Sequence, residues 1–93
     1  MMTTVMITGA NRGIGIELVN TYTADGAQVL ACCRRPQSAD ALQKIAAASG
    51  GRVTICPLDV TRSQDIANLK KEIKMTPIDI LINNAGVSDG IVD

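Results

Sequence analysis

Short apolar runs rich in β-branched residues alternate along the chain with segments whose apolar residues recur at helical spacing. Four runs have the pattern of β-strands, at residues 4–8, 27–33, 52–58 and 78–83. Three segments between them place apolar residues on one helical face, at about 13–24, 39–49 and 61–74. Strands and helices that alternate over such short connections predict parallel strands joined by right-handed crossovers.

This alternation predicts an α/β fold, a doubly wound parallel sheet of the Rossmann type with strand order 3-2-1-4. The runs "VLACC" (29–33) and "ILI" (80–82) are apolar without alternation, as is typical of strands covered on both faces. We expect one domain over residues 1–93, with the first and fourth strands meeting at the topological switch point.

The ends of the predicted helices carry local signals. Asp25 and Gly26 are expected to close the first helix. Ser38 is a candidate N-cap for the second helix, and Thr61 with Gln64 matches the capping box for the third. The third strand ends at Pro57-Leu58, and proline suits a strand end or a sheet edge.

Composition narrows the function classes. Nine Lys and Arg residues balance nine Asp and Glu residues, and the chain has a single aromatic residue. Both features argue against a nucleic-acid partner. No apolar run is long enough to span a bilayer, and the N-terminus lacks a signal-peptide pattern, so we expect a cytoplasmic protein without a membrane partner. Three cysteines and no histidine predict free buried thiols and no metal site.

Three glycines lie between the first strand and the first helix, in "TGANRGIG" (8–15). Gly9 permits a tight turn, Gly13 lets a pyrophosphate approach the backbone, and Gly15 lets the helix pack closely on the sheet. The amino end of the helix would then face the phosphates. The alternative is a glycine-rich turn with packing duties only.

The residues after the second strand distinguish between dinucleotides. NAD sites commonly place a carboxylate there for the ribose 2′-hydroxyl, whereas this chain has Arg34 and Arg35. An arginine fork suits a 2′-phosphate, and Arg12 approaches it from the glycine loop, so NADP is favoured over NAD. The alternative is that these arginines are merely solvated.

Two further strand ends carry candidate contacts. Asp59 and Val60 could meet an adenine amino group and ring, although Asp59 could also cap the next helix. In "NNAG" (83–86) small residues would let a ribose cross the backbone, and the amides could tie neighbouring strands together. A purely structural turn is the alternative there.

Together "TGANRGIG" (8–15), "LDV" (58–60) and "NNAG" (83–86) resemble the short-chain dehydrogenase/reductase family, above all its carbonyl-reductase-like branch. The resemblance implies a partial NAD(P)-binding Rossmann domain over residues 1–93. It further implies that Asn84 is structural and that the cofactor is bound by Gly9, Asn11, Arg12, Gly13, Ile14, Gly15, Arg34, Asp59, Val60, Asn83, Ala85 and Gly86.

Family members use a serine and a Tyr-x-x-x-Lys motif that this chain lacks. Tyr22 is the only tyrosine, Gly26 stands four residues later, and we interpret Tyr22 as a core residue. Ser88 lies in the wrong segment to be the catalytic serine, so no catalytic residue is assigned and the catalytic half is absent. The resemblance implies the NADP-binding part of an oxidoreductase acting on carbonyl or alcohol substrates with the missing half.

Two alternatives remain open, a non-catalytic dinucleotide-binding or signalling module and a degraded reading frame. In either case the first two helices should cover one sheet face and the third only part of the other. The fourth strand would then form an open edge. A longer reductase or a partner, including a homo-oligomer, would cover that surface.

Overall fold

The structure is a computed structural model and describes residues 2–59, 61–74 and 76–84. Its described part contains a four-stranded parallel sheet in the order β3-β2-β1-β4. The strands are β1 (Thr4–Thr8), β2 (Gln28–Cys33), β3 (Val53–Pro57) and β4 (Ile80–Asn83). The doubly wound sheet with strand order 3-2-1-4 is therefore confirmed.

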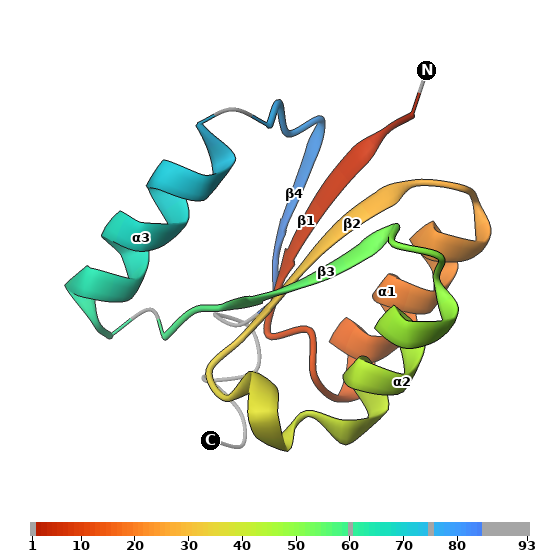
Figure 1. Cartoon of the computed structure of the whole chain (residues 1–93), viewed down its shortest axis with the longest axis horizontal. Helices are drawn as coiled ribbons and strands as arrows, with labels where there is room; N and C mark the ends of the chain where they lie inside the picture. Colours follow the sequence, from red (N-terminus) through yellow and green to blue (C-terminus); the bar gives the residue numbers. More distant parts are fainter. Residues whose placement is uncertain (1, 60, 75, 85–93) are drawn as a thin grey trace.

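Helices lie on both faces of this sheet. They are α1 (Gly13–Ala24), α2 (Asp40–Ala48) and α3 (Ser63–Ile73), and a short 3-10 turn, η1, spans Pro36–Ser38. Figure 1 shows α1 and α2 together on one face and α3 on the other. This is the distribution that right-handed crossovers impose on parallel strands.

β1 lies at the centre of the sheet and directs alternate side chains into two cores. Val5 and Ile7 are fully buried on the side of α1 and α2, where they join Val19 and Leu42 in one cluster. Met6 faces α3 and belongs to a second cluster. That cluster contains Met6, Leu30, Cys32, Cys56, Leu58 and Leu69. Both faces of β1 and β2 are thereby covered.

β4 differs from the expectation that its apolar run is covered on both faces. Leu81 is 64% exposed and Ile80 is 37% exposed, whereas β2 is buried from Val29 to Cys33. β4 pairs with β1 along one side only and lies at the edge of the described sheet. The apolar run therefore identified the strand correctly, but only β2 has the predicted cover.

The first helix ends as predicted and the other two begin differently. α1 ends at Ala24, and Gly26 follows with a φ of 87°, in the left-handed region that favours glycine. Ser38 lies in η1, so α2 begins after Ala39 with no side-chain cap bond. The proposed Ser38 cap is wrong, because Pro36 starts a separate 3-10 turn before the helix.

The predicted capping box of the third helix is also wrong. α3 begins at Ser63, with Arg62 at the N-cap position. The Thr61 hydroxyl donates to Oδ1 of Asp59 at 2.6 Å, and Gln64 donates to Asn68 instead. The Thr61 hydroxyl is thus engaged in an Asx-type turn with Asp59, and the helix begins two residues later.

Two other expectations concern buried side chains. Tyr22 is half-buried and packs against the first cluster, in line with its interpretation as a core residue. Cys32, Cys33 and Cys56 are free and buried.

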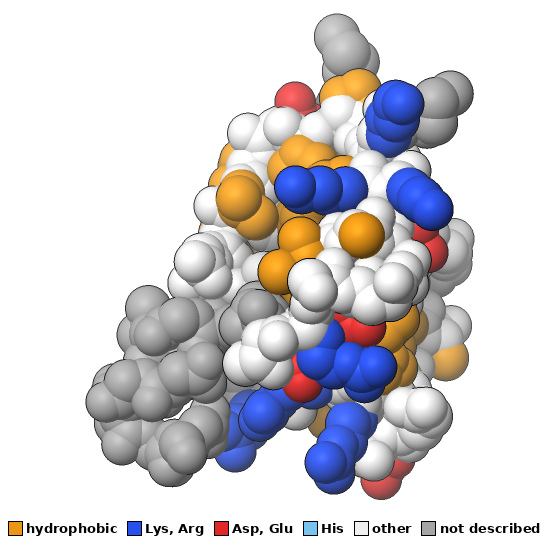
Figure 2. Space-filling view, turned by 90° about the vertical axis from the view of Figure 1, so that its left-hand side faces the viewer, with side chains coloured by type: hydrophobic (Ala, Val, Ile, Leu, Met, Phe, Trp, Pro, Cys, Tyr) orange, Lys and Arg blue, Asp and Glu red, His pale blue; other side chains and the backbone are white. Residues whose placement is uncertain are grey.

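No helix among the described residues is long and apolar enough to cross a membrane. Figure 2 shows the face that carries α3, where hydrophobic and basic side chains lie next to one another.

Candidate functional site

The strands are parallel, so their carboxyl ends meet at one edge of the sheet. The segments that leave this edge include the loop after Thr8, the arginines after Cys33, the turn after Pro57 and the amides at the end of β4. The predicted site residues of the described chain therefore lie along one edge (Figure 1). Val60, Ala85 and Gly86 lie outside the described residues.

The loop between β1 and α1 depends on backbone conformations that glycine adopts without strain. Gly9 has a φ of 60° and Gly13 a φ of 56°, both in the left-handed region. The amide of Ala10 donates to the carbonyl of Cys32 at 2.9 Å, which fixes the loop over the end of β2. The loop is thus anchored to the sheet before the helix begins.

Gly13 and Gly15 have different roles. A Cβ at Gly15 would stand 2.1 Å from the Gly9 carbonyl oxygen and 2.9 Å from Nδ2 of Asn84. A Cβ at Gly13 would meet none of the described residues within 4 Å. Gly15 is therefore required for close packing of α1 on the loop, whereas Gly13 leaves open space at the start of the helix. This division agrees with the packing role expected for Gly15.

The residues at the amino end of α1 are exposed within the described part of the chain. Arg12 occupies the N-cap position in an extended conformation and makes no side-chain cap bond to this helix. No acidic residue lies in the first turn of α1. The first amide groups of a helix have no partners within the helix, and its dipole favours a negative charge at this end. Asn11, Arg12 and Ile14 are exposed here, Ile14 by 64%.

Two asparagines join the end of β4 to the glycine loop. Asn84 is buried and donates from Nδ2 to the Gly9 carbonyl oxygen at 3.0 Å. Thr8 donates from Oγ1 to Oδ1 of Asn83 at 3.0 Å. The structural role expected for Asn84 is present, and Asn83 ties β4 to β1, as expected for the amides of this segment.

Asp59 follows β3 in a turn that keeps its side chain ionised. Oδ1 accepts hydrogen bonds from the Thr61 amide at 2.9 Å and from the Thr61 hydroxyl at 2.6 Å. These bonds, and then the positive charges of Arg34 and Arg62, hold the pKa of Asp59 below its ordinary value.

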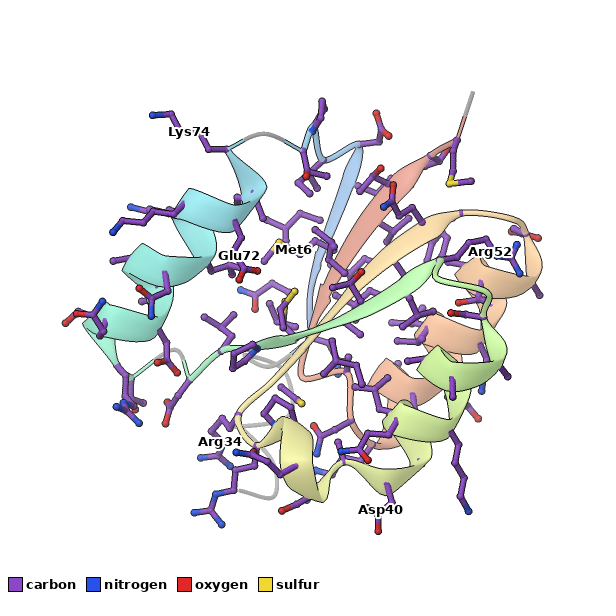
Figure 3. The ribbon with its side chains drawn as sticks, viewed as in Figure 1. Met6, Arg34, Asp40, Arg52, Glu72 and Lys74 are labelled. Carbon is purple, nitrogen blue, oxygen red and sulfur yellow. The ribbon has the colours of Figure 1, made fainter. Side chains whose placement is uncertain are left out.

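Arg34 follows β2 and Asp59 follows the neighbouring parallel strand β3, so the two residues lie at the same end of the sheet. Arg12 belongs to the glycine loop. Arg34 and Arg35 are both exposed, and Figure 3 shows Arg34 at the end of β2, close to η1. Arg62 was missed by the sequence analysis. The available signal was its place three residues after Asp59, within the turn that leads into a predicted helix.

Asp65 is a second residue that sequence reasoning missed. Its Oδ2 accepts a hydrogen bond from the main-chain amide of Asp59 at 3.0 Å. The sequence signal was an acidic residue in the first turn of a helix, a common position for a carboxylate that reaches back to preceding amides.

The remaining groups of the described chain that could carry chemistry are metal ligands and thiols. No group of three or more Cys, Asp or Glu residues is arranged to hold a metal ion in the described part of the chain. Cys32 and Cys56 are directly paired across β2 and β3, and burial together with a shared hydrogen bond raises the pKa of the Cys32 thiol. Glu72, which extends from α3 toward the sheet in Figure 3, raises it further. Ser88 lies outside the described residues.

The sequence and the structure were compared with known proteins. The family model for short chain dehydrogenase matches residues 3–92. The chain is 37% identical over 87 residues to the ketoacyl reductase HetN of Nostoc sp. and 38% identical over 84 residues to gluconate 5-dehydrogenase of Gluconobacter oxydans. These matches cover 90% and 88% of this chain, but 30% and 33% of the two enzymes.

Solved structures give the same result. A carbonyl reductase from Pseudomonas aeruginosa PAO1 in complex with NADP is 35% identical, with a TM-score of 0.83 over 88% of this chain and 37% of the reductase. Menthone neomenthol reductase from Mentha piperita is 28% identical, with a TM-score of 0.79 over 89% of this chain and 31% of that enzyme. The chain thus spans about a third of the length of the curated relatives it matches. With its parallel sheet and glycine loop, it belongs to the short-chain dehydrogenase family.

Proposed function

We propose that this chain is the NADP-binding, N-terminal part of a short-chain dehydrogenase that transfers hydride between NADP(H) and a carbonyl or alcohol substrate. The observation that carries the proposal is the open backbone at Gly13, where no atom of the described residues lies within 4 Å of the position that a Cβ would take. This space adjoins the amino end of α1, so a pyrophosphate could lie against bare main chain there. The NADP complex of a structural neighbour supports the choice of ligand.

The residues of the glycine loop would contribute to cofactor binding in different ways. Gly9 and Gly13 hold the loop in left-handed conformations, so its main-chain atoms approach the ligand without side chains in the way. Asn11 and Arg12 are exposed beside the pyrophosphate position, and Ile14 offers an apolar surface there. Gly15 keeps α1 against Gly9 and so fixes the helix end that faces the phosphates.

The adenosine end is assigned to the turns after β2 and β3. Arg34 would form the bidentate pair that a 2′-phosphate accepts, with Arg12 approaching from the glycine loop. Asp59 would accept a hydrogen bond from the adenine amino group, and Val60 would pack against the ring. The Asp59 carboxylate is ionised at neutral pH, as an ordinary aspartate is, and serves as an acceptor.

The end of β4 is assigned to the ribose region, where Asn83, Ala85 and Gly86 would lie beside the cofactor. NADPH, when bound, supplies the hydride for carbonyl reduction. The role of this chain would be to bind and orient the dinucleotide. None of its described residues is assigned to proton transfer. We expect the 93-residue chain alone to show no oxidation of NADPH with a panel of carbonyl compounds.

Free buried cysteines support a cytoplasmic location for the protein. Cys32, Cys33 and Cys56 form no disulfide, and a reducing compartment maintains thiols in that state.

Isothermal titration calorimetry of the chain with NADPH and NADH tests the function. We expect NADPH to bind at least about tenfold more tightly, since a charged pair to the 2′-phosphate is present only in that ligand. Equal affinities would remove the case for NADP. Absence of binding by either nucleotide would remove the proposed function.

A further inference from the structure

The main chain of Asp59 is held by a side chain of the following helix. Oδ2 of Asp65 accepts a hydrogen bond from the Asp59 amide at 3.0 Å, six residues upstream. Asp65 is half-buried and lies in the first turn of α3. The bond therefore crosses the whole turn between β3 and α3 and connects the helix directly to the candidate adenine contact.

The same turn restrains Asp59 at three other points. Its carbonyl oxygen accepts from the Arg62 amide at 2.9 Å, and its Oδ1 accepts from the Thr61 amide and hydroxyl. The preceding residue, Leu58, donates to the Cys33 carbonyl at 2.8 Å and is fixed to the end of β2. Asp59 is thus fixed on one side by the sheet and on the other by α3.

These restraints determine where the Asp59 carboxylate points. Both Thr61 bonds end on Oδ1 of Asp59. Oδ2 accepts no hydrogen bond from the described residues, so it is available to a donor on a ligand. If the Asp59 amide lost its acceptor, the backbone could rotate at Asp59 and carry the carboxylate to a new direction. A buried or half-buried amide without a partner is costly, so the turn would rearrange to satisfy it.

We propose that Asp65 is a positioning residue that aims the Asp59 carboxylate at the amino group of a bound adenine. The inference rests on the proposed function, because it deepens the role given there to Asp59. Asp65 does not touch the ligand. It fixes the main chain of the residue that does, and it thereby contributes to the selection of adenine over bases that lack the 6-amino group.

The test compares NADP with nicotinamide hypoxanthine dinucleotide phosphate, which carries a carbonyl oxygen in place of the adenine amino group. Calorimetry with the wild-type chain is expected to show about tenfold tighter binding of the adenine ligand, since the carbonyl oxygen at position 6 of hypoxanthine cannot donate to the Asp59 carboxylate. In Asp65→Ala this ratio is expected to fall at least about threefold toward one. Asp65→Asn should keep most of the ratio, because its amide oxygen still accepts from the Asp59 amide.

The matched control is Asp40→Ala, which removes the acidic residue from the first turn of α2 and should leave the ratio unchanged. Equal weakening of both ligands by Asp65→Ala, with the ratio unchanged, would show a merely structural role and overturn the inference. If Asp65→Ala does not fold, Asp65→Glu misplaces the acceptor while keeping the charge. It should lower the ratio, and an unchanged ratio there would overturn the inference as well.

The wild-type measurement separates this inference from the proposed function. Binding of NADP without an adenine preference leaves the proposed function standing and overturns the role of Asp65. Binding of neither ligand contradicts the proposed function itself.

Discussion

Gly15 packs so tightly against Gly9 that a Cβ on Gly15 would stand 2.1 Å from the Gly9 carbonyl oxygen. The same carbonyl accepts the side-chain amide of Asn84. The first turn of α1, the glycine loop and the end of β4 therefore share one contact point. Substitutions there test how the candidate site is built, independently of any ligand.

Gly15→Ala is expected to destabilise the fold by about 3 kcal/mol or more, because backbone atoms on rigid elements must move to admit the methyl group. Urea denaturation followed by circular dichroism measures the free energy of unfolding. Gly50→Ala is the control, since Gly50 has a φ of 66° but open space around it. It should cost only the backbone strain, about 1–2 kcal/mol. Similar losses in the two variants would contradict the packing argument.

Asn84→Ala is expected to lower the free energy of unfolding by about 1–3 kcal/mol, because the half-buried Gly9 carbonyl loses its side-chain donor. Thermal and urea unfolding check the value. Asn20→Ala, an exposed position on α1, should change it by less than about 0.5 kcal/mol. If Asn84→Ala left the free energy of unfolding unchanged, the contact between β4 and the loop would contribute little to stability.

Arg34→Ala is expected to reduce NADPH affinity by about tenfold or more and to leave NADH affinity nearly unchanged. The physical reason is the loss of the cation assigned to the 2′-phosphate. Lys44→Ala, which removes an exposed cation from α2, is the control for general charge effects. Calorimetry at one fixed salt concentration measures both ligands, and a parallel loss for NADPH and NADH would remove the arginine argument.

Thr61→Val is expected to raise the pKa of Asp59 toward its ordinary value, because the hydroxyl bond is the largest cause of the lowered value. A carboxyl group with a lowered pKa stabilises the fold above its unfolded pKa, and this contribution is lost as pH falls through the folded value. The relevant window therefore lies below about pH 4. Carboxyl-carbon NMR titration measures the shift, with Thr23→Val on α1 as the control.

Cys32 and Cys33 are expected to react slowly with iodoacetamide at neutral pH. The pKa of Cys32 is raised by its hydrogen bond to Cys56 and by burial, and burial also raises the pKa of Cys33. Since the thiolate is the reactive form, both should be modified far faster in urea than in the native chain. Mass spectrometry of the alkylated peptides checks this, and rapid native modification of Cys32 would contradict it.

The periodicity of the chain was sufficient to predict the sheet and the faces covered by its helices. Val5 and Ile7 alternate with Met6, and the parallel order follows from strands joined through helices. The glycine spacing also predicted the close approach of α1, which Gly15 makes against Gly9. These features depend on local composition and on chirality that all such chains share.

Other features depend on contacts that a linear pattern does not contain. Thr61 bonds Asp59 rather than forming a capping box, because a carboxylate lies within reach in the folded turn. Asp65 and Arg62 approach Asp59 only after β3 and α3 are placed. Leu81 is apolar like the residues of β2, yet its exposure depends on which neighbours lie beside the sheet edge.

The central place of β1 has a consequence for synthesis on the ribosome. β1 pairs with β2 through residues 28–31, but its other side pairs with residues 80–83. Roughly fifty more residues must be translated before that second partner emerges, which takes about 2–10 s at ordinary elongation rates. During this interval one edge of β1 lacks its hydrogen-bonding partner, and we expect chaperones to bind the nascent chain mainly at this stage.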